Sequence, residues 1–380
     1  MTDIVVKIPD KLIINEFCKI ISFISEGIVS YQLQENELIV TVDDTYNKEE
    51  IYHLVHEMMK KYVSTQEREK IIFSNIDGTK SFYTEEFDDI HIFEEGIIGL
   101  NHNALFLYKY FEECFNKIAN ELETNSCIEK LYPVLINVKE YQKTGYLVNS
   151  PQYSMFCCSA CENIKIIESI NKGVQDNRIK SFLKEPQYAL SPSACFHTYI
   201  EYKNQELQGN TTITFTQSVF RNEGRFNFGE FGRLLDYHVK EIVFIGDCNY
   251  VNDMREKAIE KVIELLSAWG IQGIITTSSD PFVIPKMQKY KTIQLLEASK
   301  YELRLIYEKD HMLSVASFNY HGTAFTHPFN ISVKGTDINE TVTGCIGFGL
   351  ERWVMAFLRQ YGNKVEMWPQ VIKEEYYEKH

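Results

Sequence analysis

The chain has 380 residues, 44% of them hydrophobic, and a net charge of −14, which suits two domains or one large domain with an appendage. This composition excludes a disordered tail, and the acidic balance argues against a nucleic-acid-coating surface, because such affinity comes from Lys and Arg that neutralise phosphates. The first residues lack the features of a secretory signal, no run of about 18 apolar residues predicts a membrane helix, and nine irregularly spaced cysteines favour a reducing cytoplasm.

Residues 1–66 predict a small α/β domain of their own. A short strand (VVKI) precedes a helix with Leu12 and Phe17 on its apolar face, two strands follow around a polar turn at 34–36, and an amphipathic helix covers 49–62. These helices are too short for the sustained heptads of a coiled-coil arm. The polar stretch VSTQEREK at 63–70 indicates a linker to the second domain.

Residues 67–380 predict an antiparallel sheet flanked by helices. Apolar alternation predicts strands at 211–219, 238–245, 301–307 and 329–333. Helical spacing predicts helices at 104–122, 252–269 and 349–360. Because neighbouring strands are mostly joined without an intervening helix, the fold class is α+β and not a doubly wound parallel sheet.

A first group of chemically capable residues follows the strand at 211–219. Arg221 and Glu223 precede the loop GRFNFGEFGR. Arg233 is its last residue, and Tyr237 and Glu241 follow it. An arginine at a strand end can hold a phosphate with two hydrogen bonds, and a Gly-containing loop can close over a nucleotide. Taken alone, a surface hairpin with ion pairs explains these residues equally well.

A second group lies in the sequence GCIGFGLERW, residues 344–353. Gly349 opens a helix, and a helix N-terminus attracts anions. Arg352 falls in the first helical turn, where a positive charge opposes the helix dipole, so a bound phosphate would explain its position. The alternative is an ordinary strand-to-helix turn with a solvated arginine.

These elements together resemble the three motifs of the class II aminoacyl-tRNA synthetases. Helix 104–122 with LYPV at 131–134 resembles motif 1, FRNE at 220–223 resembles motif 2, and GFGLERW resembles motif 3. The segments SACFH, VKEIVFIG, SFNYH and TGCIGFGLER narrow the resemblance to the seryl-tRNA-synthetase-like amino acid:[carrier protein] ligases, which lack the tRNA-binding arm. The resemblance covers roughly residues 68–365 and implies the antiparallel catalytic core of that class, with the N-terminal domain left without a counterpart.

The resemblance implies ATP-dependent activation of a small amino acid (glycine, alanine or serine) as an aminoacyl adenylate, with Mg²⁺ on the leaving pyrophosphate. Arg221 and Arg352 would be catalytic, holding the α- and γ-phosphates. Adenine would lie between Tyr237 and Arg352, with its amino group bound by Glu223. Arg233 and Gly349 would complete the ATP site.

The resemblance further implies a zinc ion held by Cys195, Glu241 and Cys345, with a fourth position open to the substrate amine. The amino-acid pocket would include His197, Asn319 and His321. For any one of the cysteines alone, an inert core thiol is the commoner role. The cluster at 157–161, with three cysteines, lacks a second cluster at zinc-finger spacing and is interpreted as packing.

The implied partners are a phosphopantetheine carrier protein and a second copy of the chain, since motif 1 builds the dimer interface in that family. The acidic charge and the missing arm argue against tRNA, and no membrane contact is expected. The densest basic patch, at Lys286, Lys289 and Lys291 with Lys300 and Arg304 nearby, could dock an acidic carrier protein or be an ordinary solvated face.

Two alternatives remain open from the sequence. One is an aminoacyl-tRNA synthetase, or an adenylate-forming ligase with another acceptor in natural-product biosynthesis. The other is a non-catalytic regulatory paralogue that binds only an amino acid. Because Arg221 and Arg352 are present, catalysis is the favoured reading.

Overall fold

The structure is a computed structural model that describes residues 1–10, 12–62, 68–122 and 127–380. Its main feature is an eight-stranded sheet in the order β4-β14-β15-β16-β18-β13-β12-β7, antiparallel except where β7 runs parallel to β12. The strands are β4 Ile71–Ser74, β7 Ile128–Glu129, β12 Thr211–Phe220, β13 Asp236–Gly246, β14 Gly273–Thr277, β15 Lys300–Glu308, β16 His311–Gly322 and β18 Val342–Gly349. The predicted α+β class with a largely antiparallel sheet is confirmed.

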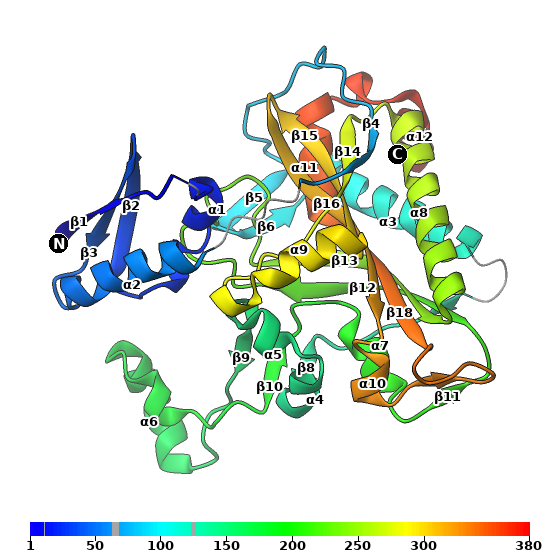
Figure 1. Ribbon diagram of the computed structural model, residues 1–380. Helices are drawn as coiled ribbons and strands as arrows, with labels where there is room; N and C mark the ends of the chain where they lie inside the picture. The colour runs from blue at the N-terminus through cyan, green and yellow to red at the C-terminus, as the bar shows by residue number, and fades with distance from the viewer. Residues whose placement is uncertain (11, 63–67, 123–126) are drawn as a thin grey trace.

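Long helices cover one face of this sheet (Figure 1). They are α3 His102–Leu122, α8 Cys248–Trp269, α11 Leu350–Tyr361 and α12 Gln370–Lys379. Phe115 of α3 stacks on Phe348 of β18 with ring centroids 4.1 Å apart, and Trp269 and Trp353 are fully buried beside them. Burial of these aromatic rings fixes the helices on this face, so the substrate-facing chemistry has to lie on the other.

Local signals set the limits of α8. The Asp247 side chain accepts a hydrogen bond from the Tyr250 N–H at the first turn, which satisfies an otherwise unpaired donor. Gly270 ends the helix with φ +58°, a left-handed conformation that glycine adopts without steric cost. None of the described helices is both long and apolar enough to cross a membrane.

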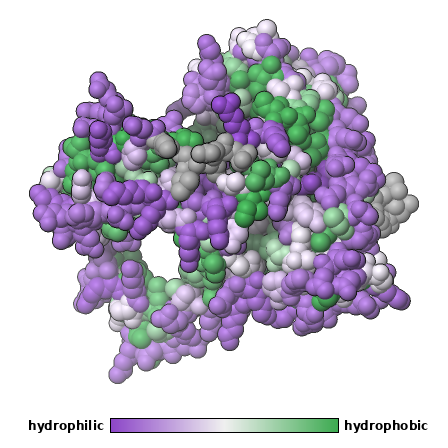
Figure 2. All heavy atoms as spheres, viewed as in Figure 1, coloured by the Kyte–Doolittle hydropathy of each residue, from purple (hydrophilic) through white to green (hydrophobic). Residues whose placement is uncertain are grey.

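Shorter elements surround the second face of the sheet. They are β5 Ile90–Glu94, β6 Ile97–Leu100, β8 Leu135–Asn137, α4 Val138–Lys143, α5 Tyr146–Asn149, β9 Met155–Cys157, α6 Ile164–Gln175, β10 Tyr188–Leu190, α7 Phe196–Glu201, β11 Glu206–Leu207, α9 Lys289–Glu297, α10 Thr326–Phe329 and β17 Ser332–Val333. Helix α6 projects from the body, and Figure 2 shows an opening between this projection and the N-terminal domain. These elements form the rim around the site.

The N-terminal domain is a three-stranded sheet with one long helix, and its buried residues form a core separate from the two cores of the larger domain. Its elements are β1 Thr2–Lys7, α1 Ile14–Cys18, β2 Ile28–Gln34, β3 Glu37–Val42 and α2 Lys48–Lys61. The sequence interpretation of this unit agrees with these elements, although the first helix is shorter than expected. The proposed boundary at residues 66 and 67, and most of the linker at 63–70, lie outside the described residues.

One predicted strand is wrong. Phe329 ends helix α10, and only Ser332–Val333 of the expected strand at 329–333 is extended, paired in parallel with β11. The reason is Asn330, whose φ of +52° turns the chain in the left-handed region. The apolar alternation of Phe329, Ile331 and Val333 therefore reflects burial in a turn.

Candidate active site

The sheet face opposite the long helices carries the candidate site. Alternation along β13 puts Tyr237, Val239 and Glu241 on this face. The register places Gly347 of β18 directly opposite Glu241. A Cβ atom at Gly347 would lie only 2.8 Å from Glu241 Oε2, so the glycine leaves the room that the carboxylate occupies.

Three predicted metal ligands come together beside this position. Cys345 lies two residues before Gly347 on the same face of β18, and Cys195 is the residue that precedes α7. The ligand atoms of Cys195, Glu241 and Cys345 all lie within 4.8 Å of one another, and all three residues are buried. Within the described ranges, no other group of His, Cys, Asp and Glu side chains meets this arrangement.

The electrostatics of this triad suit a cation. Burial and the neighbouring Cys195 raise the pKa of Glu241 well above its ordinary value. A hydrogen bond from Cys345 lowers the pKa of Cys195, and the same interaction, together with burial, raises that of Cys345. The three groups thus resist simultaneous ionisation, and a divalent cation removes that resistance. Two thiolates and one carboxylate are a donor set that zinc accepts.

The cluster at 157–161 lies elsewhere in the fold. Cys157 and Cys161 are partly buried, which is consistent with the interpretation as packing, but Cys158 is exposed and does not fit it. This segment belongs to the short strand β9 and the approach to α6, where little of the chain covers the side chains.

Of the three predicted pocket residues, two lie next to Cys345. Asn319 Nδ2 is 3.5 Å from Cys345 Sγ, and His321 Nε2 is 3.6 Å from the same sulfur. Burial lowers the pKa of His321 to about 4, so its ring is neutral at pH 7. His197 instead places Nε2 3.1 Å from the Leu135 carbonyl and Nδ1 3.3 Å from Gln217 Nε2, which are the contacts of a structural histidine.

The predicted ATP residues form a second cluster. Two arginines lie near Tyr237, with Arg352 Cζ 4.6 Å and Arg221 Cζ 5.8 Å from its ring centroid. Glu223 lies 3.1 Å from Arg233 Nη1 and 3.7 Å from Arg352 Nη2. The structure therefore brings the four charged residues of the prediction into one cluster, in which two arginines contact the Tyr237 ring and Glu223 joins Arg233 to Arg352. A nucleotide base that stacks on Tyr237 where Arg352 now lies has to displace the Arg352 guanidinium from the ring.

Arg352 has unused hydrogen-bonding capacity. It is 8% exposed, and its Nε and Nη2 atoms are buried without a hydrogen-bond partner. The 3.7 Å approach of Nη2 to Glu223 is an ion-pair distance but too long for a hydrogen bond. Gly349, the residue before α11, places this side chain in the first helical turn. Buried guanidinium donors of this kind call for an anionic acceptor.

Two residues that the sequence interpretation missed lie near Arg221. Burial alone would lower the pKa of Arg221, but Tyr237, Tyr146 and other acidic neighbours outweigh it and raise that pKa. Tyr153 also lies close enough to act on Arg221. Both Tyr146 and Tyr153 lie between the segments that resemble motif 1 and motif 2, and nothing in their local sequence distinguishes them from core tyrosines.

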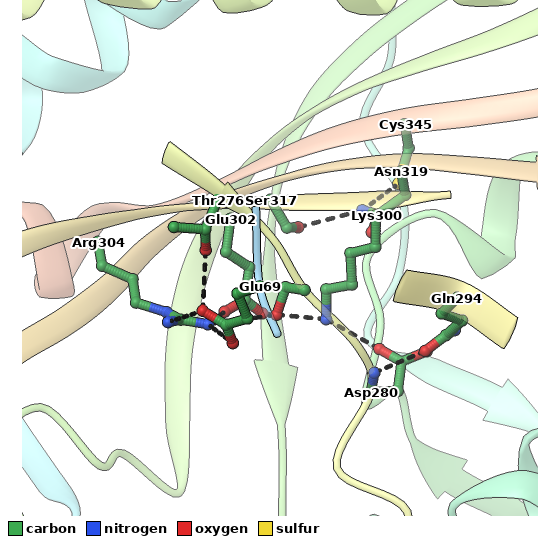
Figure 3. A network of polar contacts seen from close by, with 11 residues as sticks. Glu69, Thr276, Asp280, Gln294, Lys300, Glu302, Arg304, Ser317, Asn319 and Cys345 are labelled. Atoms are coloured by element: carbon green, nitrogen blue, oxygen red, sulfur yellow. Dashed lines mark hydrogen bonds and ion pairs between the residues drawn. The ribbon is translucent and has the colours of Figure 1, made fainter. Parts of the chain in front are cut away.

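A partly buried ion network continues along the same sheet face (Figure 3). Lys300 Nζ lies 2.8 Å from Asp280 Oδ1 and 3.1 Å from Glu302 Oε1, and Arg304 Nη1 lies 2.6 Å from Glu69 Oε2. The register puts Lys300 opposite Asn319, and Asn319 opposite Cys345. The network therefore forms a wall next to the triad.

This network leaves only two exposed cations in the candidate basic patch, for which docking and an ordinary solvated face were both open. Lys300 and Arg304 each form ion pairs with neighbouring carboxylates, among them the partly buried Glu302. Lys291 is 8% exposed, and its ammonium contacts Tyr62 Oη at 3.2 Å and Glu16 Oε2 at 3.4 Å in the N-terminal domain. Only Lys286 and Lys289 remain exposed. Periodicity on α9 could not reveal that a second domain covers Lys291.

This fold and this site define the chain as class II aminoacyl-tRNA synthetase-like. It is similar to the type-2 serine–tRNA ligase of Methanococcus maripaludis, with 27% identity over 278 residues, 69% of this chain and 52% of the ligase. The chain thus spans about half the length of the curated relatives it matches. No protein-family model matches it.

Solved structures share the fold. A Methanopyrus kandleri seryl-tRNA synthetase, in complex with Aquifex aeolicus tRNASec, matches with a TM-score of 0.69 at 18% identity, covering 99% of this chain and 77% of that one. A Pyrococcus horikoshii seryl-tRNA synthetase complexed with ATP matches with a TM-score of 0.51 at 12% identity, covering 74% and 57%. The first match extends over the N-terminal domain, which therefore has a counterpart, contrary to expectation.

The comparisons overturn the predicted partners. A carrier protein was expected and tRNA was not, yet the neighbour whose fold covers nearly the whole chain is a synthetase in complex with a tRNA. The charge argument failed because −14 is a sum over the whole chain. Phosphate contacts depend on the local arrangement of a few cations, which a net charge does not exclude.

Proposed function

We propose that this chain activates an amino acid with ATP to form an aminoacyl adenylate and pyrophosphate. The observation that carries the proposal is the buried guanidinium of Arg352, which has unpartnered donors and lies beside Tyr237 and Glu223. An anion and a planar base together satisfy this arrangement, and ATP supplies both.

In this reaction a carboxylate oxygen of the amino acid attacks the α-phosphorus, and the bond from that phosphorus to the bridging oxygen breaks as pyrophosphate leaves. Arg221 would neutralise the α-phosphate and Arg352 the γ-phosphate. Glu223 would accept a hydrogen bond from the adenine amino group. Mg²⁺ is expected on the leaving pyrophosphate. Catalysis then consists of positioning and charge stabilisation, without a side-chain nucleophile.

We propose that Cys195, Glu241 and Cys345 hold a zinc ion. Their burial, mutual distance and donor types support this assignment. When bound, a zinc ion with three protein ligands supplies an open position that takes a neutral amine. Asn319 and His321, next to Cys345, would border the amino acid on that side.

Serine is the first candidate substrate, and tRNA the first candidate acceptor. The support is the similarity to type-2 serine–tRNA ligases and to seryl-tRNA synthetase structures. Because the chain covers only about half of those ligases, both assignments rest on similarity and not on the geometry of the site.

The test of activation is pyrophosphate exchange, in which labelled pyrophosphate enters ATP only when an adenylate forms reversibly. We expect exchange that depends on one amino acid, with serine first in a screen of all twenty. Absence of exchange with every amino acid would reject activation and favour a paralogue that only binds amino acids. Exchange without acylation of total tRNA would keep activation and reject tRNA as the acceptor.

A further inference from the structure

The loop between β12 and β13, residues 221–235, contacts the N-terminal domain. Arg225 lies at the centre of this contact. Its guanidinium donates hydrogen bonds to four backbone carbonyls of the N-terminal domain, those of Ser22, Ser25, Glu26 and Ile28. The acceptors lie between the short 3-10 helix at Ile21–Phe23 and Ile28, the first residue of β2. The forked guanidinium suits such a cluster of acceptors, and a lysine would reach fewer of them.

A second side chain connects this contact to the nucleotide cluster. Asn227 Nδ2 donates to the Lys19 carbonyl at 2.9 Å and to the Glu223 carbonyl at 2.6 Å. One amide therefore joins the N-terminal domain to the residue whose carboxylate lies between Arg233 and Arg352. Phe226 adds an apolar contact, since its ring lies 5.7 Å from that of Tyr31 and packs on the N-terminal core.

The same domain also holds a second segment at the rim of the site, residues 278–299. Val283 packs on the N-terminal core, and the buried Lys291 ammonium contacts Tyr62 and Glu16. Asp280 of this segment binds Lys300 in the wall beside the triad (Figure 3). The N-terminal domain thus contacts the two segments that flank the nucleotide and amino-acid sides of the site.

We propose that the N-terminal domain positions the ATP-binding loop, with Arg225 as the positioning residue that acts through Glu223. This inference rests on the proposed ATP-dependent activation and assigns the domain a part in the first half of that reaction. Residues 221–235 lie outside any strand, so their arrangement depends on contacts at both ends of the loop. Loss of the Arg225 contacts lowers the fraction of molecules whose loop is arranged to bind ATP. The apparent affinity for ATP then decreases in proportion to that fraction.

The test compares Arg225→Met with Arg178→Met in the full chain. Arg178 makes one ion pair, with Asp176 near α6, and contacts neither the N-terminal domain nor the candidate active site. For Arg225→Met we expect the KM for ATP in pyrophosphate exchange, and the Kd for ATP by calorimetry, to rise about tenfold or more, while the KM for the amino acid stays within about twofold. Arg225→Lys should fall between wild type and Arg225→Met. Arg178→Met should match wild type.

A lower kcat with both KM values unchanged would mean that Arg225 serves only to keep the protein folded, and would overturn the proposal. Unchanged kinetics would overturn it as well. If Arg225→Met does not fold, Asn227→Ala makes the same comparison with a smaller change. Absence of exchange and of ATP binding in the wild type would instead reject the proposed function, so the two failures are distinguishable.

Discussion

The proposed metal side and the proposed nucleotide side of the site differ in what holds their side chains. Glu241 and Cys345 lie on β13 and β18, strands paired on both sides in the middle of the main sheet. Glu223 and Arg233 lie on a loop, and their positions depend on an ion pair with each other and on contacts from the N-terminal domain. Two of the three triad residues are therefore set by strand register, whereas Cys195 precedes α7, and Glu223 and Arg233 are set by tertiary contacts.

This difference predicts two kinds of response to substitution. On the strands, a changed side chain removes a chemical group but leaves its neighbours in place, because the backbone is fixed by hydrogen bonds on both edges. On the loop, a changed side chain also alters the position of its neighbours. Substitutions at the triad should therefore change metal content selectively, and those on the nucleotide side should change ATP affinity and rate together.

The largest effect is expected for Arg352→Gln. The change removes the charge and the buried Nε and Nη2 donors that have no hydrogen-bond partner. If these donors stabilise the phosphates in the transition state, kcat/KM for ATP in pyrophosphate exchange should fall about 100- to 1,000-fold.

Arg359→Gln is the matched control for this variant, because Arg359 lies on the same helix and donates to the Tyr83 carbonyl at 2.7 Å. It should lose some stability but keep most of its exchange activity per folded molecule. Equal exchange activity of Arg352→Gln and wild type would remove the main support for the ATP site.

A smaller and more selective effect is expected for Glu241→Gln. The amide keeps the shape of the side chain but cannot bind a cation as a carboxylate does. Zinc affinity, measured by competition with a chelator, should fall by at least the roughly 10- to 100-fold that even outer-shell changes cause. The KM for the amino acid should rise, while the Kd for ATP should stay near that of wild type.

Glu302→Gln is the control, since Glu302 is a partly buried carboxylate on the same sheet face but pairs with Lys300 and Arg304. It should retain its zinc. A Glu241→Gln variant that keeps a full equivalent of zinc after dialysis against chelator would contradict the assignment of this ligand.

The sequence was sufficient for those parts of the structure that depend on local pattern. Alternation along 238–245 places Val239 and Glu241 on one face, and helical spacing identifies α3, α8 and α11. The strand register could not be predicted in this way. Glu241 lies opposite Gly347 because β13 pairs with β18, and no local pattern contains that information. The triad was predicted only through resemblance to a family, and its members lie far apart in the chain.

Contacts between domains were beyond prediction for a related reason. Lys291 follows two exposed lysines and has the same charge, so composition gave no reason to separate it from Lys286 and Lys289. Its burial results from Tyr62 and Glu16, more than 200 residues earlier in the chain. The same holds for Arg225, whose acceptors are backbone carbonyls that carry no sequence signal.

The smallest effect on activity is expected for Glu302→Gln, a strand residue outside the nucleotide cluster. Burial alone would raise the pKa of Glu302, but Lys300 and Arg304 outweigh it and lower that pKa from 4.5 to about 2. Because the folded-state pKa is depressed, the ionised carboxylate stabilises the fold above its unfolded-state pKa. That stability is lost as pH falls from about 5 towards 2 and amounts to about 3 kcal/mol at pH 7.

Urea unfolding of Glu302→Gln and wild type at several pH values measures this contribution. The variant should be less stable at pH 7, and the difference should shrink as pH falls towards 2. Glu264→Gln removes an exposed carboxylate paired with Lys261 and should show no comparable change. If Glu302→Gln lowered exchange activity as much as Arg352→Gln, the ion network would be part of the catalytic machinery. The contrast between the ion network on the strands and the nucleotide cluster on the loop would then fail.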